Sequence, residues 1–384
     1  MNRDQLTAMT EAAELTRAGR FAEATALIQR SLNGGGAGTT VVPGTIVIDE
    51  ERPPPPEPRG GGLKDLLRER LSRVADGVRT HLPPSGLTHL PGLDNLGGLG
   101  GPPAAMPTLP GRTLQAVHRG AAGARPYTLY VPTTGTGPRP LVVMLHGGTQ
   151  TAADFATATR MSELAEEHGV LVAYPEQVTS ANAMRYWNWF EPGDQRRGAG
   201  EPAVLAGIVD EIAREHEVDR ERVFVAGFSA GAAMAAVLGA AYPDVFAAVG
   251  VHSGLPHGCA HDVASAFAAM RGGARPRALD RPVPVIAFHG DADSTVGVDN
   301  ATRVVEQFTG GAVRGDTLVE RGPGRPATRV VVRRDGDVTG ELWTVHGSGH
   351  AWSGGVAGGS YTDPGGPDAS AEMLRFFAEH PRRP

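Results

Sequence analysis

From Gly111 to the end of the chain, short runs of Val, Ile and Leu alternate with longer segments that carry apolar residues at helical spacing. The runs LVVML, VLVAY, VFVAG and PVIAF are apolar throughout, as strands are when helices cover both faces of their sheet. Strands that alternate with helices are joined by crossover connections, which favours parallel pairing. We therefore predict one α/β domain over residues 111–384, with a mostly parallel central sheet and helices on both faces.

The order of elements within this domain follows from the same pattern. RTLQAVHR and RPYTLYVP predict an opening β-hairpin, and FATATRMSELAEEHG predicts one helix capped by Gly169. The turn at Asp335 and Gly336 joins two further predicted strands. Helices are predicted over 202–218, 229–242, 301–308 and 370–380.

Two segments of different composition come before this domain. Residues 1–32 have apolar positions at helical spacing interrupted by AGR, which predicts a small helical arm. Residues 33–110 are rich in Gly and Pro and predict a flexible linker. One amphipathic stretch within it, 63–82, predicts a helix that docks on the main domain or lies on a hydrophobic surface.

Composition excludes several classes of function. A formal net charge of -6 gives no sign of a nucleic-acid or anionic-membrane partner. Cys259 is the single cysteine, so an intramolecular disulfide is impossible, and neither a cysteine nucleophile nor a metal site with His257 and His261 is favoured. We expect no metal or other cofactor. No signal peptide or membrane span is evident, which predicts a cytoplasmic protein.

The stretch VFVAGFSAGAAMAAVLGAAYP places Ser229 between a strand-like and a helix-like run. Gly227 and Gly231 leave room for a sharp turn that lifts the serine hydroxyl above the carboxyl ends of the strands. This is the G-x-S-x-G nucleophile elbow of α/β-hydrolases. A glycine-rich helix start capped by serine is the structural alternative, but the strand–turn–helix context favours a nucleophile.

A serine nucleophile needs a histidine base and an acid that orients it, in the chain order Ser, Asp or Glu, His. The loop after VPVIAFHG offers Asp291, Asp293 and Asp299, of which Asp293 is preferred and Asp291 is second. The segment ELWTVHGSGHAWSGG offers His346 and His350; His350 is preferred because it lies in a glycine loop able to reach the serine. The other histidines that end strands are expected to orient loops: His146, His252 and His289.

The oxyanion of the transition state needs fixed donors. The backbone N–H of Ala230 follows the nucleophile, and LHGGTQ offers that of Gly148, with Thr149 next.

The indoles of Trp187, Trp189 and Trp352 are candidate walls of a substrate pocket, with buried core as the alternative.

These motifs together resemble the polyhydroxybutyrate depolymerase-type esterases of the α/β-hydrolase superfamily, which are related to feruloyl and acetylxylan esterases. The resemblance rests on LHGGTQTAADF, WNWFEPGDQRRGAGEP, VFVAGFSAGAAM, FHGDADSTV and GSGHAWSGG, in this order. It implies a triad of Ser229, Asp293 and His350. Members of that family often carry cysteine at the positions of Gly148 and Tyr186. The absence of both cysteines here fits a reducing compartment, although the family itself suggests an extracellular location as the alternative.

The sequence therefore predicts a serine esterase that acts on poly(3-hydroxybutyrate) or its oligomers. A feruloyl or acetylxylan ester is the alternative substrate. A polymer-surface binding protein on a hydrolase scaffold is the alternative from another class. The sequence leaves the oligomeric state open.

Overall fold

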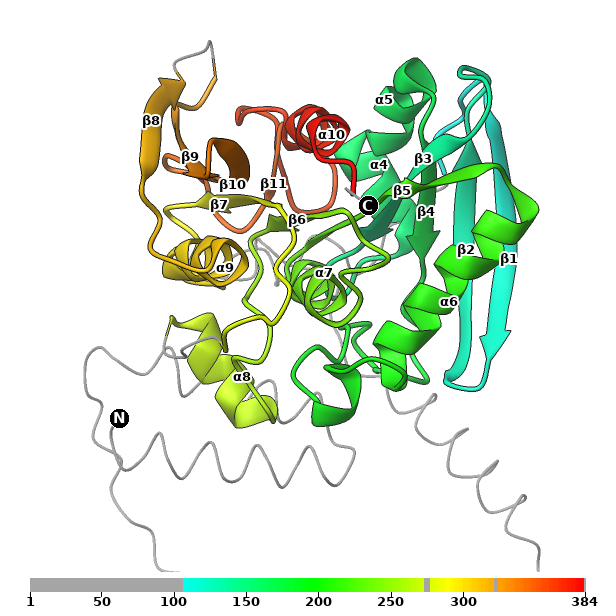
Figure 1. Cartoon of the computed structure of the whole chain (residues 1–384), viewed down its shortest axis with the longest axis horizontal. Helices are drawn as coiled ribbons and strands as arrows, with labels where there is room; N and C mark the ends of the chain where they lie inside the picture. The colour runs from blue at the N-terminus through cyan, green and yellow to red at the C-terminus, as the bar shows by residue number, and fades with distance from the viewer. Residues whose placement is uncertain (1–105, 273–276, 321–323, 383–384) are drawn as a thin grey trace, which may run out of the picture. The chain divides into compact units, whose positions relative to one another are not determined.

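The computed structural model describes residues 106–272, 277–320 and 324–382 (Figure 1). The predicted arm over 1–32, and the linker up to residue 105 with its helix at 63–82, lie outside the described residues. The first described element begins at Arg112, directly after the boundary predicted for the main domain.

The core of the fold is a ten-stranded sheet in the order β1-β2-β4-β3-β5-β6-β7-β10-β9-β8. The strands from β4 to β10 in this order pair in parallel, and antiparallel strands extend both edges. The strands of the sheet are β1 (Arg112–Gly120), β2 (Gly123–Val131), β3 (Arg139–Leu145), β4 (Leu171–Pro175), β5 (Val218–Phe228), β6 (Ala248–His252), β7 (Val285–Gly290), β8 (Gly315–Glu320), β9 (Ala327–Arg334) and β10 (Asp337–Val345). A short parallel pair, β11 (Trp352–Ser353) and β12 (Thr362–Asp363), follows β10.

Helices cover both faces of the sheet, as predicted (Figure 1). One hydrophobic core packs α6 (Gly200–Glu215), α7 (Ala230–Ala241), α8 (Val263–Met270) and α9 (Asp299–Thr309) against the first face. The other core packs α4 (Ala152–Thr159), α5 (Met161–His168) and α10 (Ala369–Glu379) against the second. Strands β4, β6 and β7 are buried along their whole length, and β3 and β5 are buried over their carboxyl-terminal parts, which explains the continuous apolar runs.

The prediction of a single helix over 155–169 is wrong, because the structure has two helices in this region. Arg160 takes a left-handed conformation with φ 56°, ending α4 and starting α5 at an angle. Thr151 and Asp154 form a capping box that starts α4. Gly169 caps α5 with φ 68°, as predicted.

Candidate active site

The turn after β5 is strained and tightly packed. Ser229 has φ 54° and ψ -119°, a conformation that non-glycine residues rarely adopt. A Cβ at Gly231 would lie 2.2 Å from the carbonyl oxygen of Leu145, and one at Gly227 would lie 2.5 Å from the carbonyl carbon of Gly231. Both glycines are therefore required for β5 to turn directly into α7, with Ser229 at the corner.

The structure brings Ser229, His350 and Asp293 into one chain of hydrogen bonds. The Ser229 Oγ lies 2.9 Å from the His350 Nε2. The His350 Nδ1 lies 2.7 Å from the Asp293 Oδ2. Because these residues follow β5, β10 and β7 respectively, the carboxyl edge of the parallel strands assembles side chains that are far apart in sequence. The geometry is that of a nucleophile, a base and an orienting acid.

The Asp293 carboxylate is fully buried and held from several sides. Its Oδ1 accepts hydrogen bonds from the backbone N–H groups of Thr295 at 2.8 Å and Val296 at 2.9 Å. Its Oδ2 also lies 3.3 Å from the His289 Nε2. Burial acts to raise the pKa of Asp293, but the hydrogen bonds from His289 and His350, with the charge of His350, outweigh it and hold this pKa below its usual value. The carboxylate is therefore ionised at neutral pH and able to stabilise an imidazolium at His350.

The second-ranked pair, Asp291 and His346, forms a separate contact. The His346 Nδ1 lies 2.8 Å from the Asp291 Oδ2, while its Nε2 lies 2.8 Å from the Thr328 Oγ1 rather than from Ser229. The other Asp291 oxygen accepts a hydrogen bond from Gly347 N at 2.6 Å. This pair anchors the start of the loop that carries His350.

The candidate oxyanion donors differ in availability. Ala230 is the first residue of α7, where a backbone N–H has no intrahelical partner. The Gly148 N–H has no hydrogen-bond partner among the residues that the structure describes. In contrast, the Thr149 N–H donates to Met184 O at 2.8 Å. The geometry therefore favours Ala230 and Gly148 over Thr149.

Gly148 and Tyr186 lie side by side. A Cβ at Gly148 would be 2.2 Å from the Tyr186 ring. The two positions at which the resembling family often carries cysteine are thus adjacent in space, and an aromatic ring packs on a glycine there. Tyr186 is 40% exposed, and the Tyr361 ring lies 6.4 Å from the His350 ring between centroids. Sequence reasoning did not assign either tyrosine to the site.

The three tryptophans lie in the core rather than on an exposed pocket wall. The exposed fractions of Trp187, Trp189 and Trp352 are 0%, 6% and 1%. The Trp187 Nε1 donates to His146 O at 3.0 Å, so this indole supports the strand end that precedes Gly148. Trp352 stacks on the His252 ring behind the site. Their contact with substrate is not supported, and their position fits the core alternative.

The strand-end histidines orient loops, as expected. The His146 Nε2 accepts from Gln177 N at 3.0 Å, and the His252 Nε2 accepts from Ser353 N at 2.9 Å. The His289 Nε2 donates to Val296 O at 2.8 Å. Burial lowers the pKa of His146 to about 4, so its ring stays neutral.

Cys259 is buried, and burial raises the pKa of its thiol to about 12, which removes the thiolate needed for nucleophilic chemistry. Over the described parts of the chain, no group of three or more His, Cys, Asp and Glu side chains is placed to hold a metal ion. In those same parts, no helix has the length and apolar character needed to cross a membrane.

Glu201 at the start of α6 holds the loop that carries Trp187. Its carboxylate accepts from Asn188 N at 2.7 Å and from the Gln177 Nε2, and lies 3.4 Å from the Arg125 Nη2. Arg125 is only 5% exposed. Burial raises the pKa of Glu201 to about 6, against the hydrogen bonds that lower it. This carboxylate is thus the main anionic partner of a buried guanidinium.

We predict that Glu201→Ala lowers the free energy of unfolding by about 3 to 5 kcal/mol, because it leaves the buried Arg125 charge without its partner. Urea denaturation measures the change. Glu215→Ala on the same helix, at an exposed position, is the matched control with an expected change within about 0.5 kcal/mol. Equal effects of the two substitutions would contradict the prediction.

The fold and the site geometry define an α/β-hydrolase. The structure is similar to that of acetyl xylan esterase from Aspergillus awamori, with a TM-score of 0.54 and 21% identity over 70% of this chain and 100% of the other. Residues 125–329, more than half of the chain, match the family described as Esterase PHB depolymerase, and the chain belongs to that family.

Curated relatives agree with this family. Poly(3-hydroxyalkanoate) depolymerase C of Paucimonas lemoignei is 37% identical over 252 residues, which are 62% of this chain and 58% of the relative. Feruloyl esterase B of Neurospora crassa is 33% identical over 143 residues, 37% of this chain and 48% of the relative. A probable acetylxylan esterase A of Aspergillus fumigatus is 34% identical over 132 residues, 34% of this chain and 35% of the relative. The chain thus spans less than two thirds of the length of each.

Proposed function

We propose that this protein is a serine esterase that hydrolyses carboxylic esters through an acyl-enzyme intermediate. The observation that carries the proposal is the unbroken hydrogen-bond chain from the Ser229 Oγ through His350 to the buried Asp293 carboxylate, at 2.9 Å and 2.7 Å. Such a chain makes a serine hydroxyl reactive at neutral pH.

In the first half-reaction, the Ser229 Oγ attacks the ester carbonyl carbon while the His350 Nε2 accepts the hydroxyl proton. The ionised Asp293 stabilises the resulting imidazolium and fixes its orientation. The tetrahedral oxyanion accepts hydrogen bonds from the N–H groups of Ala230 and Gly148. Collapse breaks the bond between the acyl carbon and the alcohol oxygen, and His350 gives its proton to the departing alkoxide.

In the second half-reaction, water gives a proton to His350 and attacks the acyl-enzyme. The Ser229 alkoxide leaves and recovers the proton from His350, so the enzyme returns to its starting state. The products are one alcohol and one carboxylic acid, and the cycle uses no redox step or cofactor.

The proposed substrate is poly(3-hydroxybutyrate) or a related short-chain polyhydroxyalkanoate, as polymer or oligomer. Among the relatives named above, the depolymerase aligns over the longest stretch of this chain, 252 residues. An acetylxylan or feruloyl ester is the second candidate, supported by alignments of 132 and 143 residues.

The test combines turnover with covalent labelling. The wild type is expected to hydrolyse p-nitrophenyl butyrate and to be labelled by a fluorophosphonate at Ser229, located by mass spectrometry. Rates on poly(3-hydroxybutyrate), its oligomers, acetylated xylan and a feruloyl ester then rank the substrates. If the wild type shows no turnover and no labelling, the alternative of a binding protein on a hydrolase scaffold is favoured.

A further inference from the structure

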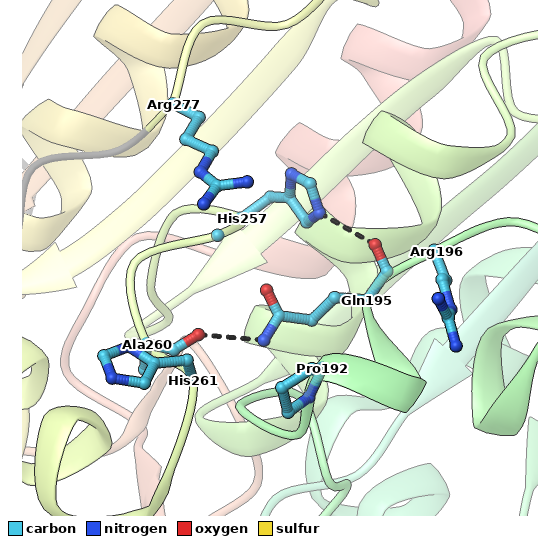
Figure 2. A pocket seen from close by; sticks show the side chains of 8 residues that line it. Pro192, Gln195, Arg196, His257, Ala260, His261 and Arg277 are labelled. Carbon is cyan, nitrogen blue, oxygen red and sulfur yellow. Dashed lines mark hydrogen bonds between the residues drawn. The ribbon is translucent and has the colours of Figure 1, made fainter.

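A cavity of about 340 Å³ lies between the loop around η1 (Pro192–Asp194) and the loop that follows β6 (Figure 2). Its polar lining comes from both loops and from the segment before β7. The side chains that matter to its chemistry are Gln195, Arg196, His257, His261 and Arg277. None of them belongs to the proposed catalytic machinery.

The walls of this cavity are tied together by hydrogen bonds. The Gln195 Nε2 donates to Ala260 O at 2.9 Å, and the His257 Nε2 donates to Gln195 O at 3.0 Å, so each loop holds the other (Figure 2). The buried Gln307 side chain accepts from His257 N at 2.9 Å and donates to Arg277 O at 2.7 Å. The cavity is therefore formed before any ligand enters it, which lowers the cost of binding.

The described residues that line the cavity include two arginines and no carboxylate. Arg196 and Arg277 are both exposed and lie on either side of Gln195 and His257 in Figure 2. Neither guanidinium forms an ion pair with a carboxylate of the described residues. Burial lowers the pKa of His257, and the charge of Arg277 lowers it further, so the two arginines supply the charge at neutral pH.

Three acidic side chains flank the lining residues in sequence: Glu191 and Asp194 at η1, and Asp262 before α8. The Asp194 Oδ1 accepts a hydrogen bond from Glu201 N at 2.6 Å. Asp262 accepts from Ser265 N at 2.7 Å as the cap of α8, and it lies 3.8 Å from the His261 Nε2. A guanidinium presents paired N–H donors that match a carboxylate. A small anion in this cavity would meet a guanidinium on either wall.

The cavity and Ser229 are linked through β6. Ser229 N donates to the carbonyl of His252, the last residue of β6, at 2.9 Å. His257 follows five residues later, so its Cα lies at most about 18 Å from that of His252. An ester chain of a few repeat units is long enough to cover such a distance.

We propose that this cavity binds the free carboxylate end of a short ester oligomer whose scissile carbonyl lies at Ser229. The inference rests on the proposed function and narrows it. Each chain of a polyester such as poly(3-hydroxybutyrate) has one carboxylate end, so the site favours short oligomers over the interior of a long polymer. The enzyme then acts foremost as an oligomer hydrolase.

The test uses 3-hydroxybutyrate trimer as the free acid and as its methyl ester, with the double variant Arg196→Gln/Arg277→Gln. For the free acid, KM in the variant is expected to rise by roughly tenfold to a hundredfold with kcat little changed, since charged hydrogen bonds are lost. KM for the methyl ester should stay within about twofold of the wild type, because the ester has no charge to lose. Arg112→Gln/Arg119→Gln on β1 removes the same charge elsewhere and should change neither.

Two controls separate this inference from the proposed function. Hydrolysis of p-nitrophenyl butyrate reports on the triad alone, and its absence in the wild type would overturn the esterase proposal instead. Calorimetric titration of the free acid into Ser229→Ala, with and without the arginine substitutions, measures binding without turnover. Equal affinity with and without the two arginines, or an equal rise in KM for acid and methyl ester, overturns the carboxylate site.

Discussion

Ser229→Ala is expected to lower kcat for p-nitrophenyl butyrate by a factor of about 10⁵ to 10⁶ while leaving the fold intact. The methyl group of alanine fits where the serine Cβ already lies, and alanine meets the same backbone strain at this corner as serine does. What disappears is the oxygen that forms the acyl-enzyme. The residual rate reflects an attack by water assisted by the oxyanion donors.

The measurement is steady-state hydrolysis by the variant next to thermal unfolding, so that lost activity is not confused with lost structure. Ser162→Ala is a suitable control, because it also removes a serine hydroxyl, one on α5 that is buried 2.7 Å from the Tyr174 hydroxyl on β4. Its activity should stay within a few-fold of the wild type. Retention of more than about one hundredth of the activity by Ser229→Ala would show that another group is the nucleophile.

The central fold could be predicted because its signals are local. Buried parallel strands have apolar runs and helices have amphipathic ones, and both patterns are present wherever the core decides the structure. The break at Arg160 has no comparable signal, since a non-glycine residue with positive φ is set by packing rather than by its own preference. Strand β8 was not predicted because it is a short, exposed edge strand with Leu318 and Val319 open to solvent.

The nucleophile turn was also a local prediction, because Gly227 and Gly231 are required within one turn of Ser229. The acid and the base are a different case. Asp291 and Asp293 follow the same strand, as do His346 and His350, and each aspartate pairs with one histidine. Only the directions of the side chains in space determine which pair reaches Ser229.

The tryptophans illustrate a further limit of sequence reasoning. An indole has a large apolar surface and one donor, which serves a core as well as it serves a pocket. The burial of Trp187 and Trp352 depends on neighbours contributed by distant segments, such as Arg125 and Phe155. Tyr186 was passed over although it is exposed beside Gly148, because only the fold brings these two positions together.

The two aspartate–histidine pairs provide the sharpest test of the proposed triad. Asp293→Asn is expected to lower kcat by a factor of about 10⁴. The Oδ1 of the new amide can keep the hydrogen bonds from Thr295 N and Val296 N, which places its NH₂ group opposite the His350 Nδ1. That nitrogen must then accept, so the proton moves to Nε2, and His350 can no longer take the proton of Ser229.

Asp291→Asn is the matched control, with the same change of charge two residues away. Asp291 binds His346 and Gly347 rather than His350, so this substitution should lower kcat by less than about tenfold. It would loosen the loop that carries His350 but leave the acid of the triad in place. Both variants are compared at one pH after their unfolding curves have been shown to agree with the wild type. If Asp291→Asn lost more activity than Asp293→Asn, the acid of the triad would have to be reassigned. The role of His350 would then fall as well, because the hydrogen bond to Asp293 that orients its imidazole would not be the one that catalysis needs.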